Sequence, residues 1–179
     1  MRLSSVTVKL QLPYIGGIEG NWQPDERERD AAWEMYVELI TRVAVVELRP
    51  DEGLLREALT SLYSLFDTTR GILRKYGPSI AKSKRGSDLS FGYIAVSVLN
   101  GLLRPLLAKW HPLLADHEAR RDPEVSPVDH ERRWAQASEL RHEIEATRQV
   151  LREYADILAE VAGIEPLPWP QAETKAGVS

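Results

Sequence analysis

Apolar and polar residues alternate near the start of the chain, and apolar residues then recur every three or four positions through most of the rest. In residues 5–12, SVTVKLQL, every second residue is apolar, which predicts a strand with one buried face. Pro13 and a following Gly-Gly pair interrupt this pattern, and residues 18–22 are expected to return as a second strand. The sequence therefore predicts an N-terminal β-hairpin within residues 1–23.

Helical periodicity covers residues 24–162 in four long segments. The first segment is expected to bury a stripe that includes Trp33, Tyr36 and Ile40. The third begins at Ser87 or Asp88, and proline at position 105 must kink or split it because proline removes a backbone hydrogen bond. The expected helices are residues 24–48, 52–76, 88–119 and 127–162. The predicted fold class is mainly α: an antiparallel four-helix bundle, its third helix kinked at Pro105, with a short N-terminal hairpin.

The domain organisation follows from where the periodicity stops. Residues 1–163 are expected to form one helical-bundle domain, with the hairpin in residues 1–23 and the helices in 24–162. Residues 164–179 contain three prolines and no periodicity, which predicts an irregular tail. Its PLPWP stretch, residues 166–170, has two open interpretations: it docks on a partner, or it folds back onto the bundle.

Composition narrows the setting of the protein. The chain has no cysteine, which excludes disulfides, thiol nucleophiles and thiolate metal sites. The longest charge-free stretch, residues 89–103, is shorter than the ~20 residues of a membrane-spanning helix. The N-terminus lacks the apolar run of a signal peptide. We therefore expect a cytoplasmic protein that makes no membrane contact.

The charge is unevenly distributed along the chain. The net charge is −4, yet residues 70–85 contain six basic residues and no acidic one, which leaves 17 basic and 27 acidic residues elsewhere. The basic residues are Arg70, Arg74, Lys75, Lys82, Lys84 and Arg85. One interpretation is a solvated loop; the other is a docking surface for an acidic protein, a nucleotide or an RNA backbone.

A second candidate site lies on the apolar third helix. Ser90, Ser97, Arg104 and His111 are spaced by seven residues, which on a helix is nearly two turns, so they are expected on one stripe. Asn100 lies one turn before Arg104. A structural interpretation pairs the arginine with an acid or a carbonyl, and the histidine with a backbone carbonyl. An alternative is a small anionic ligand bound between the helices.

The Arg104-x6-His111 spacing also resembles the Arg-x4-6-His motif of the HEPN ribonucleases. That resemblance implies metal-independent RNA cleavage, often at a site shared by two copies of the chain. Histidine would supply an acid or base near neutral pH, and arginine would stabilise the charge that develops on the phosphate. The sequence departs from the family in that Pro105 follows the arginine, where a polar residue is usual.

Motifs for other chemistry are missing from the sequence. It contains no GxxxxGK phosphate loop and no GxSxG nucleophile turn, and His142-Glu143 lacks the second histidine of HExxH. We therefore expect no cofactor and no metal.

Three longer stretches resemble a group of uncharacterised actinobacterial helical proteins. They are WEMYVELITRVAVVEL (33–48), LREALTSLYSLFDTTRGILRKYGP (55–78) and LSFGYIAVSVLNGLLRPLLAKWHPLL (89–114). The resemblance implies a place near multi-gene conflict or defence systems, and it brings no catalytic residues. The leading expectation is a non-enzymatic interaction or regulatory subunit with a protein partner. A homodimer and nucleic-acid binding stay open as alternatives. The binding residues expected are those of the basic segment together with Asn100, Arg104 and His111.

Overall fold

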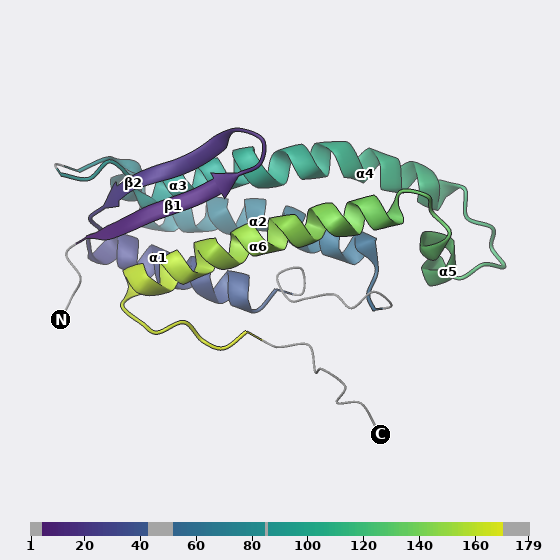
Figure 1. Ribbon diagram of the computed structural model, residues 1–179. Helices are drawn as coiled ribbons and strands as arrows, with labels where there is room; N and C mark the ends of the chain where they lie inside the picture. Colours follow the sequence, from purple (N-terminus) through teal and green to yellow (C-terminus); the bar gives the residue numbers. More distant parts are fainter. Residues whose placement is uncertain (1–4, 43–51, 85, 170–179) are drawn as a thin grey trace, which may run out of the picture.

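The computed structural model describes residues 5–42, 52–84 and 86–169, which are mainly helical with one two-stranded sheet (Figure 1). The strands are β1 (Val6–Leu12) and β2 (Gly16–Trp22). The helical segments are α1 (Glu26–Ile40), α2 (Leu55–Tyr76), η2 (Pro78–Ala81), α3 (Phe91–Val98), η3 (Leu99–Leu103), α4 (Arg104–Ala119), α5 (Pro127–Arg132) and α6 (Ala137–Ala162). The predicted mainly helical class and the N-terminal hairpin are confirmed.

The hairpin is antiparallel, and its register runs from Val6 opposite Trp22 to Leu12 opposite Gly16. The alternating residues of β1 are at most 1% exposed, as the sequence pattern predicts. The turn consists of residues 13–15, so the expected interruption at the glycines is wrong: Gly16, with φ +86°, already begins β2. The buried face lies on α6 and on the third helix, where Gly101 leaves room for the side chains of Leu12 and Ile15.

Helix α1 begins with a capping box, in which the Asp25 and Glu28 side chains each accept a hydrogen bond from the other's backbone N–H. Its buried face contains Ala31, Ala32, Met35, Tyr36 and Leu39. The expectation that Trp33 is buried is wrong: it is 43% exposed, whereas Ala31, Ala32 and Met35 are buried. The helix ends earlier than predicted, at Ile40 with Thr41 as its C-cap, and residues 43–48 of the prediction lie outside the described residues.

The third helix runs without a break from residue 91 to residue 119, through α3, η3 and α4. It begins after Ser90, whose hydroxyl accepts from the Tyr93 N–H, so neither Ser87 nor Asp88 is the cap. Instead of a split, a π-helical turn, η3, precedes Pro105, which lies in the first turn of α4. A π turn often accommodates an interruption of helical hydrogen bonding.

The predicted fourth helix is broken into α5 and α6, so the expectation of one helix over residues 127–162 is wrong. Ser126 caps α5, and its hydroxyl accepts a hydrogen bond from the Asp129 N–H. After α5 the chain turns, and the buried Glu131 carboxylate accepts a hydrogen bond of 2.8 Å from the Leu55 N–H at the start of α2. The break therefore allows one side chain to satisfy the uncapped N-terminus of another helix.

The long helices run side by side, and their apolar faces share one core with the hairpin (Figure 1). Helix α1 packs on α6 and α2, and α2 also contacts α4. Residues 163–169 are irregular, as predicted, and they return to the helices: the Leu167 N–H donates to the Tyr36 hydroxyl at 2.6 Å. Trp169 lies under the Arg152 guanidinium. Of the two interpretations of the PLPWP stretch, folding back holds for the described part.

Candidate functional site

A hollow of about 260 Å³ lies between α2 and α4 and contains part of the predicted site. It is lined by Tyr63, Phe66, Arg70, Arg104, Leu107, Ala108 and His111, which we call the α2–α4 face. The structure therefore brings Arg70 from the basic segment together with Arg104 and His111 from the third helix. These residues come from two separate sequence predictions.

Phe66 is the centre of this face. The Arg104 guanidinium carbon lies 5.2 Å from the centre of the Phe66 ring, and that of Arg70 lies 6.0 Å from it. Arg70 also pairs with Asp67 one turn earlier. Arg104 donates from Nε to Asn100 Oδ1 at 3.0 Å, and it has no ion pair within the described ranges. The expected pairing of Arg104 with an acid is therefore not found there, and its charge faces solvent.

His111 is held by a second arginine. Its Nδ1 lies 2.7 Å from Arg56 Nη1, and Arg56 in turn forms a two-pronged ion pair with Glu118. Because a guanidinium only donates, Nδ1 must accept, and the ring proton lies on Nε2. The expected bond from His111 to a backbone carbonyl is replaced by this contact.

The electrostatic environment favours the neutral form of His111. Burial lowers its pKa below the usual value, and the adjacent Arg56 charge lowers it further, against an opposing effect of Glu118. The ring also contacts the exposed Tyr63 edge-on, with 5.8 Å between ring centres. Near neutral pH this side chain thus offers a hydrogen-bond donor, Nε2–H, and its only lone pair already accepts from Arg56.

The other described residues of the basic segment do not line this hollow. Lys75 pairs with Glu34 of α1, and Lys84 pairs with Asp25 and Glu28. Arg74 and Lys82 are exposed without an ion pair in the described part of the chain, and Arg85 lies outside it. Of the five basic residues of this segment that the structure describes, Arg70 alone lines the α2–α4 face.

The seven-residue stripe on the third helix is also divided. Ser90 is a buried cap, whereas Asn100 and Arg104 are exposed and His111 is half-buried. The π turn between them places an extra residue in the helix, so the heptad spacing no longer aligns the two halves. Only the second half of the stripe contributes to the face.

This arrangement suits the binding of a negatively charged group. Two arginines over an aromatic ring can bind a carboxylate or a phosphate, because a guanidinium group donates two parallel hydrogen bonds to either anion. Within the described residues no group of three or more histidine, aspartate or glutamate side chains could hold a metal ion. Sequence reasoning missed Phe66 and Tyr63 as site residues; the only available signal was their spacing of four and seven residues from Arg70.

One continuous helix in the described residues, Phe91–Ala119, is long and apolar enough to cross a membrane. The core helix of a soluble protein meets the same criteria, and 61% of the apolar window of Phe91–Ala119 is buried inside the protein.

Comparison of the chain with protein-family models, curated proteins and solved structures gave no match. Any functional assignment must therefore rest on the geometry of the chain itself.

Proposed function

We propose that this protein is a non-enzymatic interaction or regulatory subunit that binds an acidic segment of a partner protein at its α2–α4 face. The observation that carries the proposal is Arg104. It lies over the Phe66 ring, which Arg70 also approaches, with its charge exposed and no acid paired to it among the described residues. A carboxylate from a partner would complete the pairing that the chain itself leaves open.

The aromatic side chains favour a protein partner over a small anion. Tyr63 is 57% exposed at the edge of the hollow, and tyrosine and arginine are the residues that most often dominate protein interfaces. The hollow, at about 260 Å³, is smaller than the roughly 300–1,000 Å³ typical of ligand pockets. These two facts make a small anionic ligand between the helices the weaker alternative.

The setting that we propose comes from the resemblance to actinobacterial helical proteins. The subunit would be a four-helix bundle that works in the cytoplasm as part of a bacterial multi-protein system, of the defence or conflict kind. The side-by-side arrangement of the long helices supports the bundle. A homodimer remains an alternative assembly, in which a second copy would occupy the same face.

A binding assay tests the proposal. The probe is a fluorescein-labelled acidic dodecapeptide rich in glutamate, followed by fluorescence anisotropy at low salt, beside neutral and basic peptides of equal length. We expect Arg104→Ala to weaken binding about tenfold, because a charge-assisted hydrogen-bond pair is lost. The matched control is Arg120→Ala, which removes the same charge from the exposed end of α4, away from the face. Equal weakening by both variants would overturn the proposal.

A metal-independent ribonuclease is the second candidate, supported by one observation: Arg104 and His111 line the same hollow. The Arg56 contact argues against it, because a general base needs the lone pair that already accepts at Nδ1. The test is RNA cleavage without divalent metal by the parent protein and by Arg104→Ala and His111→Ala, with circular dichroism to verify folding. Cleavage that both folded variants lose would replace the interaction proposal.

A further inference from the structure

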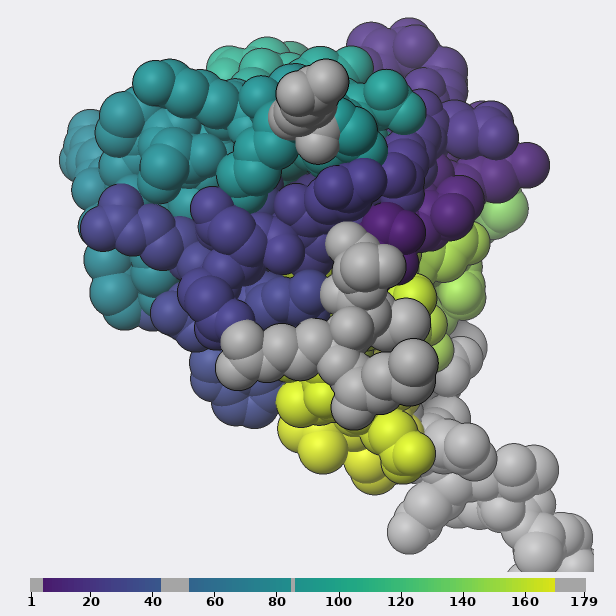
Figure 2. Space-filling view, turned by 90° about the vertical axis from the view of Figure 1, so that its left-hand side faces the viewer, coloured from purple at the N-terminus to yellow at the C-terminus, as the bar shows by residue number. Residues whose placement is uncertain are grey.

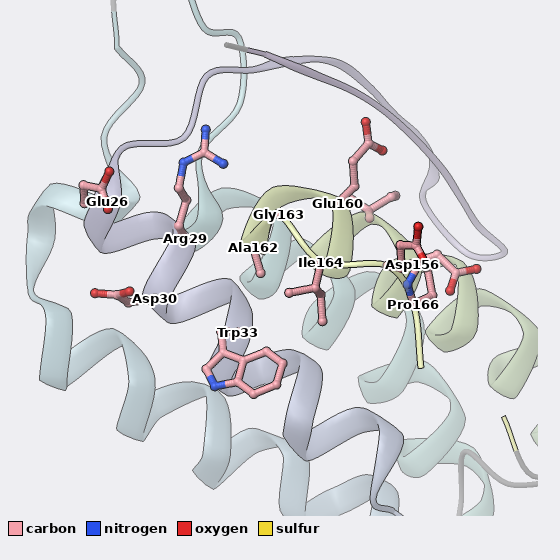
Figure 3. Close-up of a pocket in the computed structure, with 12 residues that line it drawn as sticks. Glu26, Arg29, Asp30, Trp33, Asp156, Glu160, Ala162, Gly163, Ile164 and Pro166 are labelled. Atoms are coloured by element: carbon pink, nitrogen blue, oxygen red, sulfur yellow. The ribbon is translucent and has the colours of Figure 1, made fainter. Parts of the chain in front are cut away.

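A second, larger hollow of about 1,090 Å³ lies on a different part of the molecule, between α1, the end of α6 and residues 163–166 (Figure 3). Figure 2 shows the end of the molecule where α1 begins, with the end of α6 and the residues that follow it, up to residue 169, in yellow nearby. No residue lines both this hollow and the α2–α4 face. We call it the α1–α6 groove.

The α1–α6 groove is strongly acidic. Its lining carries five carboxylates and a single guanidinium, that of Arg29, which donates to the Val161 carbonyl at 2.7 Å. The carboxylates belong to Glu26, Asp30, Asp156, Glu160 and Glu165. Asp30, Glu160 and Glu165 have no ion pair with any residue that the structure describes. Three of the five carboxylates in the groove therefore have no opposite charge paired to them in the described part of the chain.

An exposed tryptophan joins this groove to a neighbouring one. Trp33 lines the acidic hollow and also a second hollow of about 400 Å³ between α1 and α2. Trp33 is 43% exposed, whereas Ala32 and Tyr36 close to it on α1 are buried. In the second hollow the acids are already paired, Glu34 with Lys75 and Glu38 with Arg42. The uncompensated charge is therefore confined to one side of the indole.

We propose that the α1–α6 groove is a docking site for an extended basic segment of a second partner protein. A lysine or arginine side chain of that segment would lie against the Trp33 indole, a contact that favours cations. Its neighbours would pair with Asp30 and Glu160. Charge complementarity selects the basic partner, and the exposed indole supplies the apolar contact that acids alone do not offer.

The size of the groove favours a peptide segment over a small cation. The acidic hollow alone exceeds the roughly 300–1,000 Å³ of a typical ligand pocket, and the second hollow extends it past Trp33. With an acidic partner at the α2–α4 face and a basic one here, the protein would bridge two partners of opposite charge. The two sites can be tested separately, because they share no lining residue.

The first test uses nuclear magnetic resonance. The chain has five tryptophans, so its ¹H–¹⁵N spectrum contains five indole signals, and Trp33→Phe identifies the one from Trp33. The probe is a dodecapeptide of alternating lysine and leucine, titrated into the full chain. We expect the Trp33 indole and the backbone amides of residues 156–165 to shift. Shifts confined to other surfaces, or no shift at all, would overturn the proposal.

The second test measures affinity for the same peptide by fluorescence anisotropy. The double variant Asp30→Asn, Glu160→Gln should bind about fivefold more weakly, since each exposed ion pair contributes little alone. Trp33→Ala should bind about tenfold more weakly. The matched control, Glu19→Gln with Glu124→Gln, removes two carboxylates from exposed positions elsewhere and should leave the affinity unchanged. If the control variant binds as weakly as the groove variants, the effect is one of net charge and the proposed docking site is overturned.

Discussion

Two charged side chains of this protein have opposite environments. Glu28, at the start of α1, is 1% exposed, and each of its carboxylate oxygens accepts more than one hydrogen bond. Oε1 accepts from the Trp22 indole and the Phe91 N–H, and Oε2 accepts from the Asp25 N–H and pairs with Lys84. Arg104 is exposed, and its only polar contact among the described residues is with Asn100.

The difference separates charges that hold the fold from charges that are available to a partner. A buried charge is tolerated only when it is fully paired, so Glu28 ties the hairpin, α1, the loop before α3 and α3 itself together. Arg104 does not join elements of the fold in this way, so its guanidinium can exchange bound water for a partner's carboxylate. Lys84, which the sequence placed with the binding residues, belongs structurally to the Glu28 group.

The largest expected effect is the loss of the buried carboxylate. Glu28→Ala should lower the free energy of unfolding by about 3–5 kcal/mol, because Lys84 and two buried donors lose their acceptor. Urea denaturation followed by circular dichroism measures this. Glu19→Ala, an exposed change on β2, should stay within about 0.5 kcal/mol of the parent. Equal effects of the two variants would end the distinction between the regions.

Two glycines extend the same comparison from charge to packing, because one has close neighbours and the other has none. A Cβ at Gly92, next to the Phe91 N–H that bonds Glu28, would lie 2.7 Å from the Ala81 Cβ and 2.9 Å from its Cα. Gly92→Ala should therefore destabilise the protein by about 1–3 kcal/mol. Gly71 in α2 has nothing within 4 Å, so Gly71→Ala should stabilise by about 0.5–1 kcal/mol. If both variants shift the urea midpoint in the same direction, the difference in packing around the two glycines is contradicted.

The pH dependence of stability tests the environment of His111. Its pKa is lowered in the folded state by burial and by Arg56, so below the usual value of 6.5 the unfolded chain binds more protons than the folded one. The contribution of His111 is therefore present above pH 6.5 and is lost as the pH falls through the lower folded pKa. Urea midpoints measured from pH 7.5 to 5.5 should fall less steeply for His111→Gln than for the parent. Identical slopes would show that the Arg56 contact does not persist in solution.

The smallest expected effect on folding is that of Arg104→Ala. Its exposed guanidinium makes one hydrogen bond and one cation–ring contact, so the free energy of unfolding should change by about 0.5 kcal/mol. Urea denaturation beside the peptide-binding assay checks both properties at once. A loss of several kcal/mol would place Arg104 with Glu28 as a structural residue and would remove the basis of the proposed docking face.

The sequence pattern was sufficient to predict buried residues where a single element buries one face and exposes the other. The alternation in β1 predicted the buried residues of that strand correctly. The π turn was not predictable, because residues 91–107 are apolar nearly all round and offer no face to follow. The break before α6 was also hidden, since Trp134 and Arg141 keep a helical spacing across it.

The site was predictable only in part, because its contacts join residues distant in sequence. The spacing of Arg104 and His111 placed them on one stripe, and both do line one hollow. Nothing local indicated that Arg56 would bond His111 from 55 positions away, or that Glu28 would bond Lys84 from 56. Trp33 was assigned to the core by spacing alone, whereas it is largely exposed and its neighbour Ala32 is buried.

The π turn at Leu99–Leu103 takes up one residue more than a regular α-helical turn would hold. Each residue of an α-helix turns the chain by about 100°, so deleting one residue from the regular helix before this turn would rotate that part of the helix relative to Arg104 and His111. Deleting one residue within the π turn would instead restore regular winding and leave the side chains on both sides in place. The turn is thus a point at which related chains could gain or lose a residue while keeping the α2–α4 face.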